Sequence, residues 1–201
     1  MTDISGDDRG GGTPQGPTVI LGSGTYYDYV RPEINVPTLE DLAYALAFEC
    51  RFSGQCISRR TGRRVFYSVA QHCVVMSHQV EARLAYDALM HESGELACRD
   101  ASTELKKLCP DYKAVEKRCE AAMFARFRVP MLDKAAIKAA DLRMLATERR
   151  DLLNWNGEAW GIDALTTPYD FEIEPLTPEG SAEAFIARFR ETAPAEIRGM
   201  A

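Results

Sequence analysis

The sequence predicts an all-helical domain that follows a short N-terminal β-ribbon. After residue 37, most segments place apolar residues three or four positions apart behind residues that cap helices, the pattern of amphipathic helices. Residues 18–30 instead alternate around a Gly-Ser-Gly break. The chain has 201 residues, of which 46% are hydrophobic and 27% charged, and these values fit a single globular domain with a sizeable core.

The two ends of the chain are expected to lie outside the folded domain, which should span 18–192. Residues 1–17 should form a disordered tail because Gly, Pro and Asp are frequent there and offer little to bury. Residues 193–201 are expected to be a flexible C-terminus. Between them the chain opens with TVILGSGTYYDYV at 18–30, where two apolar runs flank the glycines and predict a two-stranded ribbon.

Two helices are expected next. Thr38 can cap a helix over 39–51, with Glu40 and Asp41 in the first turn, where the helix dipole favours anions. Ser68 can cap a second helix over 69–80. The basic segment between them, RRTGRR at 59–64, is either a solvated loop or a docking point for polyphosphate at the mouth of a site.

Four more helices are expected, over 82–97, 110–127, 134–153 and 178–190. Each of the last three begins with a proline or a capping side chain in the positions that favour a helix start. The second of the four has apolar residues along one face, as in a helix that packs against a core.

Charge and cysteine usage bound the class of protein. A formal net charge of −6 argues against broad, sequence-independent binding to nucleic acid. We find neither an export signal nor a run of about 18 apolar residues long enough to span a membrane. The six cysteines include no Cys-x-x-Cys pair, so three disulfides are the less favoured interpretation and a cytoplasmic protein with free thiols is expected.

Three polar residues fall on apolar stripes of three different expected helices. His72 shares its stripe with Val69 and Met76, and His91 follows the stripe of the next helix. Asp141 lies on a stripe of otherwise mostly apolar residues, and burying an unpaired carboxylate costs several kcal/mol. The three groups therefore require one another or a cation; separate hydrogen-bonded core residues are the alternative. The remaining histidine, His78, is expected at the surface or behind the ligands.

Three segments in this order resemble the signatures of HD-domain metal-dependent phosphohydrolases. They are YSVAQHC at 67–73, ALMHESGE at 88–95 and KAADLRMLATERRDLL at 138–153. The resemblance covers roughly residues 18–192 and is closest to the small single-domain nucleotide hydrolases of bacteria and phages. It implies an all-helical HD bundle behind the ribbon. HESGE also differs from the His-Glu-x-x-His zinc-protease motif, because Glu95 stands where the second histidine is required.

The resemblance implies four metal ligands: His72, His91, Glu92 and Asp141. It differs from the family at one of them, since the family pairs His with Asp and this chain has Glu92, one methylene longer. Two imidazoles and two carboxylates suit one divalent ion, Mn, Co or Zn, with Mg possible. Three histidines are too few for the dinuclear versions of the fold.

The resemblance also implies the residues that act on substrate. Glu95 takes the position of the carboxylate that activates water, and Asp100 matches a carboxylate that helps to position water or substrate. Arg51 and Lys106 take positions that hold phosphate. Phe52 takes a position that packs against the sugar.

The implied reaction is hydrolysis of the 5′-phosphate ester of a deoxynucleotide. Relatives divide into monophosphatases and phage enzymes that cut a deoxynucleoside triphosphate such as dATP at the α-phosphate, and both attack the same phosphorus. The implied setting is a small-molecule nucleotide substrate in the cytoplasm, or the host cytoplasm for a phage enzyme, with a homo-oligomeric protein. The alternative is a catalytically silent HD scaffold that binds a nucleotide or a protein partner, and Glu92 is its sequence support.

Overall fold

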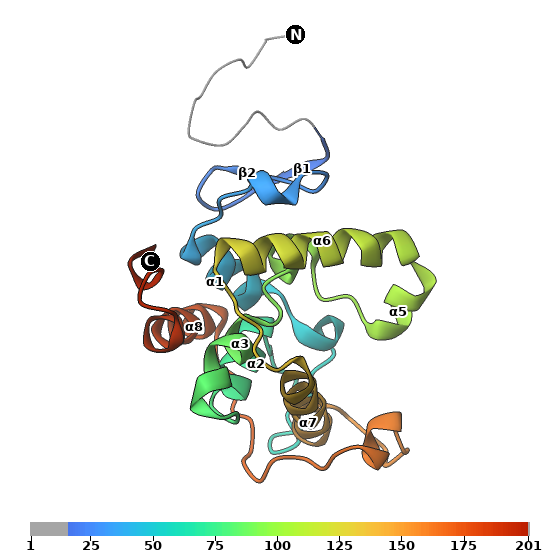
Figure 1. The fold of residues 1–201 in the computed structure, drawn as a ribbon. Coiled ribbons are helices and arrows are strands. Elements are labelled where there is room, and N and C mark those ends of the chain that lie inside the picture. Colours follow the sequence, from blue (N-terminus) through green and yellow to red (C-terminus); the bar gives the residue numbers. More distant parts are fainter. Residues whose placement is uncertain (1–15, 201) are drawn as a thin grey trace.

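The computed structural model describes residues 16–200, so nearly all of the expected tail at 1–17 lies outside the described residues. The described chain is an all-α domain preceded by a two-stranded sheet, which confirms the predicted fold class. Figure 1 shows the ribbon beside the long helix α6 (Pro110–Arg126), with α7 (Lys134–Leu152) toward the other end of the molecule.

The ribbon pairs β1 (Thr18–Ile20) with β2 (Tyr26–Asp28) in antiparallel register, with Val19 opposite Tyr27. The turn between the strands closes through the Leu21 amide, which donates to the Thr25 carbonyl at 2.8 Å. Gly24 has a φ of +83°, a left-handed conformation that glycine adopts without strain. The Gly-Ser-Gly break therefore marks this turn as expected.

Helix α1 (Leu39–Phe48) begins at the predicted cap. The Thr38 hydroxyl accepts a hydrogen bond from the Asp41 amide at 3.0 Å, and the Asp41 carboxylate accepts one from the Thr38 amide at 2.9 Å. This reciprocal capping box satisfies two amides that a helix start otherwise leaves unpaired.

The expected extension of this first helix to residue 51 is wrong. The chain leaves α1 after Phe48 and forms the short 3-10 turn η2 (Arg51–Gly54), in which Phe52 and Ser53 have φ values of 52° and 51°. A right-handed helix cannot contain this left-handed backbone. Arg51 is consequently placed by a tight turn rather than by a helix face.

Helix α2 (Val69–Ser77) starts at Ser68, whose hydroxyl accepts from the Gln71 amide at 3.1 Å. The expected helix over 82–97 is divided into η3 (Ala82–Leu84), α3 (Ala85–Met90) and α4 (Glu95–Cys98), with a turn at 91–94. A tertiary contact accompanies the break, because a Cβ at Gly94 would lie 2.9 Å from the Cα of Glu120 on α6.

The other three expected helices are confirmed to within a few residues, and α5 (Thr103–Leu108) is an additional helix. The remaining elements are η1 (Pro32–Ile34), α6, α7, η4 (Gly161–Ala164), α8 (Pro178–Thr192) and η5 (Arg198–Met200). The packed part extends beyond the expected boundary at 192, because Ala193 and Ile197 are buried in the core.

Two apolar clusters flank α2. Helix α8 packs against α1 and α2, and the larger cluster joins these helices to α3 and α6 through residues such as Leu46, Met90 and Phe189. The smaller cluster lies between α2 and α7 and includes Met76 and Met144. Helix α2 thus presents His72 at the boundary between the two clusters.

The structure can be compared with two expectations, one about the cysteines and one about membrane-spanning segments. All six cysteines, every one within residues 50–119, are free. None of the helices between residues 16 and 200 combines the length and the apolar character that crossing a membrane requires.

Candidate metal centre

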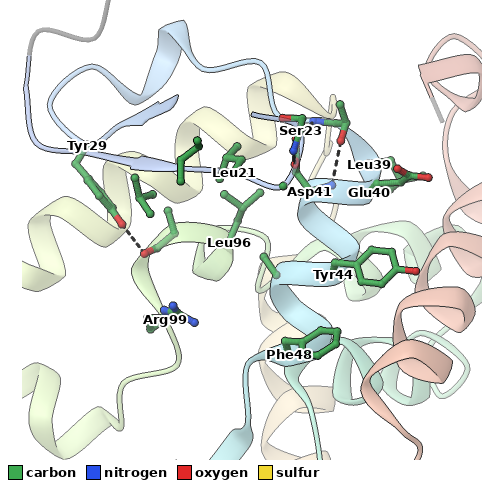
Figure 2. A pocket seen from close by; sticks show the side chains of 16 residues that line it. Leu21, Ser23, Tyr29, Leu39, Glu40, Asp41, Tyr44, Phe48, Leu96 and Arg99 are labelled. Carbon is green, nitrogen blue, oxygen red and sulfur yellow. Dashed lines mark hydrogen bonds between the residues drawn. The ribbon is translucent and has the colours of Figure 1, made fainter. Parts of the chain in front are cut away.

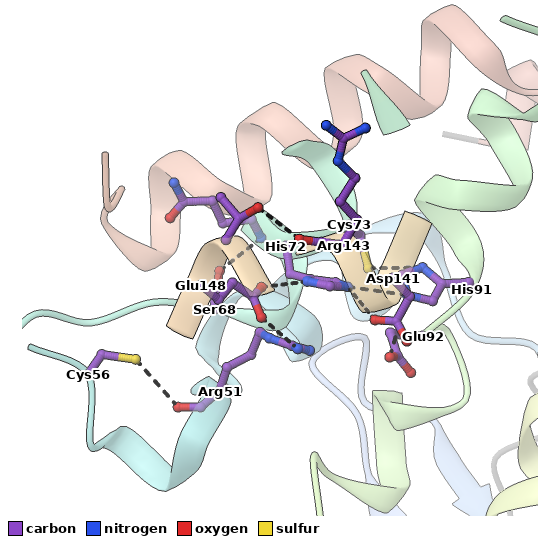
Figure 3. A network of polar contacts seen from close by, with 12 residues as sticks. Arg51, Cys56, Ser68, His72, Cys73, His91, Glu92, Asp141, Arg143 and Glu148 are labelled. Atoms are coloured by element: carbon purple, nitrogen blue, oxygen red, sulfur yellow. Dashed lines mark hydrogen bonds and ion pairs between the residues drawn. The ribbon is translucent and has the colours of Figure 1, made fainter. Parts of the chain in front are cut away.

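Three separate elements bring four potential metal ligands together. His72 comes from the middle of α2, His91 and Glu92 follow the end of α3, and Asp141 comes from the second turn of α7. One ligand atom from each of the four side chains lies within 4.8 Å of the others. Figure 3 shows the His72 ring between Glu148 on one side and the other three residues on its opposite side.

The two imidazole rings point the same nitrogen at each other. His72 Nε2 lies 3.3 Å from His91 Nε2 and 3.5 Å from a carboxylate oxygen of Asp141. His91 Nε2 in turn lies 3.5 Å from a carboxylate oxygen of Glu92. The additional methylene of Glu92 therefore still leaves its carboxylate within the group.

The outer nitrogen of each ring faces an oxygen acceptor. His91 Nδ1 lies 2.8 Å from the Ala88 carbonyl, which can only accept, so this nitrogen carries the hydrogen. His72 Nδ1 lies 2.6 Å from Glu148. In the neutral rings the two Nε2 lone pairs consequently face each other, and they repel unless a proton or a cation lies between them. We conclude that the donor set fits a divalent cation.

The charge states of Asp141 and His91 depend on their burial and on neighbouring charged side chains. Burial acts to raise the pKa of Asp141, but His72, His91 and Lys138 outweigh it and hold this pKa well below its usual range. Lys138 contributes from one turn earlier, with its ammonium 2.7 Å from the carboxylate. Burial lowers the pKa of His91 and favours its neutral ring. An ionised Asp141 beside a neutral imidazole is the state that binds a metal.

Glu95 stands at the start of α4, one turn beyond His91. It is 5% exposed, and within residues 16–200 its Oε2 has no hydrogen-bond partner. Burial, reinforced by the carboxylates of Glu92 and Asp100, raises its pKa to about 10. A positive charge placed among the four ligands would favour its ionised form, because opposite charges stabilise each other most at buried sites.

A small cavity of about 250 Å³ opens beside the metal centre. Lys106 lies in its wall, 3.8 Å from Glu95 and 2.5 Å from Glu116. The expected phosphate-binding lysine therefore faces the same space as Glu95 and is held by a second carboxylate. The complete lining is His91, Glu92, Gly94, Glu95, Lys106, Glu116, Lys117 and Glu120.

Arg51 reaches the centre from the other side, through the left-handed turn η2. It is 8% exposed and donates to Glu148 at 3.0 Å, while its Nε has no partner in the described part of the chain. Its guanidinium carbon lies 5.4 Å from the centroid of the half-buried Phe52 ring. The positive φ of Phe52 thus places an aromatic face directly beside a buried cation.

Asp100 follows α4 and is half-buried, with its backbone amide donating to Glu49 at 3.4 Å. Burial raises its pKa, while Arg51 and Lys106 act in the opposite direction. Its charge therefore interacts with both expected phosphate-binding residues.

Glu148 belongs to this network and was not among the residues expected there. It is fully buried on α7, seven residues after Asp141, and contacts both His72 and Arg51. Burial acts to raise its pKa, but Arg51 and His72 outweigh burial and lower it. The available signal was its place on the same stripe of α7 as Asp141, two turns further along.

A second cavity, larger than the one beside the metal centre, lies elsewhere. It measures about 760 Å³ and is bounded by the ribbon, α1 and the end of α4, with Tyr44 and Phe48 stacked at its edge (Figure 2). None of the nine expected site residues lines it. The basic loop at 59–64 is exposed, and its Arg60 pairs with Glu174 at 3.2 Å.

The comparisons with known proteins give two relatives of the chain. It is 36% identical over 167 residues to the uncharacterized protein YfdR of Escherichia coli, covering 83% of this chain and 89% of the relative. It is 31% identical over 131 residues to the uncharacterized protein RCAP_rcc00048 of Rhodobacter capsulatus, covering 59% and 64% of the two chains. No family model matches the chain.

Proposed function

Since the chain belongs to the same protein family as YfdR of Escherichia coli, whose name carries no activity, we propose a function from the metal centre itself. The protein is a metal-dependent phosphohydrolase that cleaves the 5′-phosphate ester of a nucleotide. The observation that carries this proposal is the pair of imidazole Nε2 atoms, 3.3 Å apart and flanked by two carboxylates. A buried arginine, the type of side chain that binds phosphate, shares a carboxylate with one of these rings.

His72, His91, Glu92 and Asp141 would hold the cation, for which Mn, Co or Zn is preferred and Mg is acceptable. A divalent ion in such a site lowers the pKa of water and offsets negative charge at a phosphorus centre. The carboxylates of Glu92 and Asp141 would offset the charge of such an ion, and imidazole nitrogens of His72 and His91 would complete the ligand set.

Glu95 is the general base in this proposal. Its unpartnered Oε2 is buried beside the cavity, where it can accept the proton of an attacking water. The water oxygen bonds to phosphorus while the phosphorus–O5′ bond breaks, and the leaving O5′ takes up a proton to become the nucleoside hydroxyl. Since Glu95 then holds a proton, it can also supply one to that oxygen.

The remaining expected site residues bind the substrate. Arg51 offers the unpaired edge of its guanidinium to phosphate oxygens, and Lys106 adds a positive charge from the wall of the cavity. Phe52 packs against the sugar beside Arg51, and Asp100 orients water or substrate through its charge interaction with both cations.

The nucleotide class comes from the resemblance to the small HD-domain hydrolases of bacteria and phages. A monophosphate and a triphosphate cut at its α-phosphate share the same reacting phosphorus, so both substrates belong to the proposal. The free cysteines are consistent with the cytoplasm as its location.

Incubation of the protein with dAMP and with dATP, in the presence of Mn, Co, Zn or Mg, tests the function. We expect deoxyadenosine, measured by chromatography, from at least one of them, and we expect EDTA to abolish its formation. Phosphorus NMR then separates release of inorganic phosphate from release of triphosphate. A protein that binds a metal but yields no deoxyadenosine from either nucleotide would contradict the proposal.

Replacing Glu92 by the shorter aspartate tests whether metal binding depends on the length of this side chain. In Glu92→Asp the carboxylate withdraws by roughly one carbon–carbon bond, and we expect metal affinity to fall at least about tenfold, or ~1.4 kcal/mol. Competition with a fluorescent chelator measures this affinity. Tighter binding with faster turnover would instead mean that Glu92 is a weakened ligand, and two inert, metal-free proteins would favour the silent scaffold.

A further inference from the structure

One carboxylate connects the proposed metal centre to the proposed phosphate-binding arginine. Glu148 on α7 accepts from Arg51 through Oε2 at 3.0 Å and faces His72 Nδ1 through Oε1 at 2.6 Å. The exposed fraction of the Glu148 side chain is 0% and that of His72 is 0%, so water does not compete for either contact. Figure 3 shows both contacts on the side of His72 that faces away from the ligand group.

The Nδ1 atom of His91 also faces a hydrogen-bond acceptor, but this acceptor is a backbone group. Its Nδ1 is held by the Ala88 backbone carbonyl, which leaves Nε2 free to face the ligand group. His72 has an ionised side chain in the corresponding position. The charged partner of His72 can therefore be changed by a substitution at a side chain that is not itself a ligand, whereas the nearest partner of His91 Nδ1 is a backbone carbonyl, with the Cys73 thiol further away at 3.9 Å.

Arg51 pairs with the same carboxylate, that of Glu148. Its guanidinium is almost fully buried, and a buried charge needs a charged or strongly polar acceptor. The carboxylate offers Oε2 to Arg51 and Oε1 to His72, whereas an amide in the same position has an oxygen on one side and an NH2 donor on the other.

We propose that Glu148 is a positioning residue that holds His72 in the Nδ1–H tautomer and holds Arg51 at the edge of the same centre. The assignment for Arg51 rests on the proposed function, and the assignment for His72 rests on the metal centre alone. The metal ligand and the anion-binding guanidinium are thus set by a single side chain.

The wild-type protein gives the first test. The chain has three histidines, so long-range hydrogen–nitrogen NMR spectra of protein labelled with 15N-histidine are simple to assign, with the exposed His78 as an internal reference. In the metal-free protein we expect His72 to show a hydrogen on Nδ1 and a free lone pair on Nε2. A hydrogen on Nε2 with a bare Nδ1 would overturn the proposal without any variant.

Glu148→Gln gives the second test. The single amide oxygen is drawn to the charged Arg51, which leaves the NH2 group facing His72 Nδ1. Two donors cannot face each other, so the His72 hydrogen moves to Nε2 and occupies the lone pair that the metal needs. We expect this change of tautomer in the NMR spectrum, together with a fall in metal affinity of about 10- to 100-fold.

A double variant separates positioning from a merely structural role. In Arg51→Met/Glu148→Gln the amide oxygen no longer accepts a hydrogen bond from a guanidinium. It can therefore turn back to accept one from His72 Nδ1. We expect the Nδ1–H tautomer and most of the metal affinity to return, although the guanidinium is missing. A structural defect caused by losing Glu148 would instead become worse in the double variant.

Glu158→Gln, at an exposed glutamate, is the matched control and is expected to change neither the tautomer nor the affinity. An unchanged tautomer and affinity in Glu148→Gln, or no recovery in the double variant, would overturn the proposal. If the tautomer and affinity results hold while wild-type protein hydrolyses no nucleotide, the phosphohydrolase proposal fails and the positioning of His72 by Glu148 stands.

Discussion

Replacing Asp141 by asparagine is expected to remove the bound cation and to lower nucleotide hydrolysis by roughly two to four orders of magnitude. The change keeps the size of the side chain but removes the negative charge that lies 3.5 Å from His72 Nε2. Losing one partner of a buried charge interaction costs about 3–5 kcal/mol, which corresponds to that range. Metal content after dialysis against a limiting metal, measured by mass spectrometry, and deoxyadenosine formation check the two effects.

The control for this variant is Asp170→Asn, at an exposed aspartate, and it should retain both metal and activity. Thermal unfolding gives a second measurement. A metal that binds only the folded state raises the melting temperature, so added metal should stabilise wild-type protein and leave Asp141→Asn nearly unchanged. If Asp141→Asn binds metal with the wild-type affinity, the ion does not lie among these four ligands.

The second large effect is expected at Glu95. In Glu95→Gln the side chain keeps its size but can no longer accept a proton, so turnover should fall about 10²- to 10⁴-fold. The metal content should stay at the wild-type level, because Glu95 is not among the four ligands that the structure groups together. Turnover at saturating nucleotide, measured beside metal content in the same preparation, checks this separation.

Glu183→Gln, at an exposed glutamate on α8, provides the comparison and should turn over at the wild-type rate. Loss of metal from Glu95→Gln would make Glu95 a ligand rather than a base. Wild-type turnover in the same variant would mean that another group accepts the proton.

Much of the helical framework could be predicted because its signals are local. Thr38, Ser68, Asp133 and Thr177 each cap a helix through a contact with a residue three positions later. The division of 82–97 had no such local signal. It accompanies the close approach of Gly94 to α6, which is far away in the sequence.

The candidate site was predictable in part for the same reason. Helical spacing turned His72 and Asp141 inward, and these two residues do meet. Glu92, Glu95 and the substrate-binding residues came from the resemblance to a family, because nothing in their local spacing marks their roles. Glu148 shares the stripe of Asp141, but local spacing does not predict its pairing with Arg51, which lies 97 residues earlier in the chain.

The amino-acid sequence by itself determined where most of the helices begin and that His72 and Asp141 turn inward, since caps and apolar spacing act within a few residues. Only the tertiary structure decided how those side chains meet: that the two Nε2 atoms face each other, and that Glu148 serves both His72 and Arg51. The direction of a hydrogen bond depends on partners brought together by packing, and spacing along one helix carries no information about them.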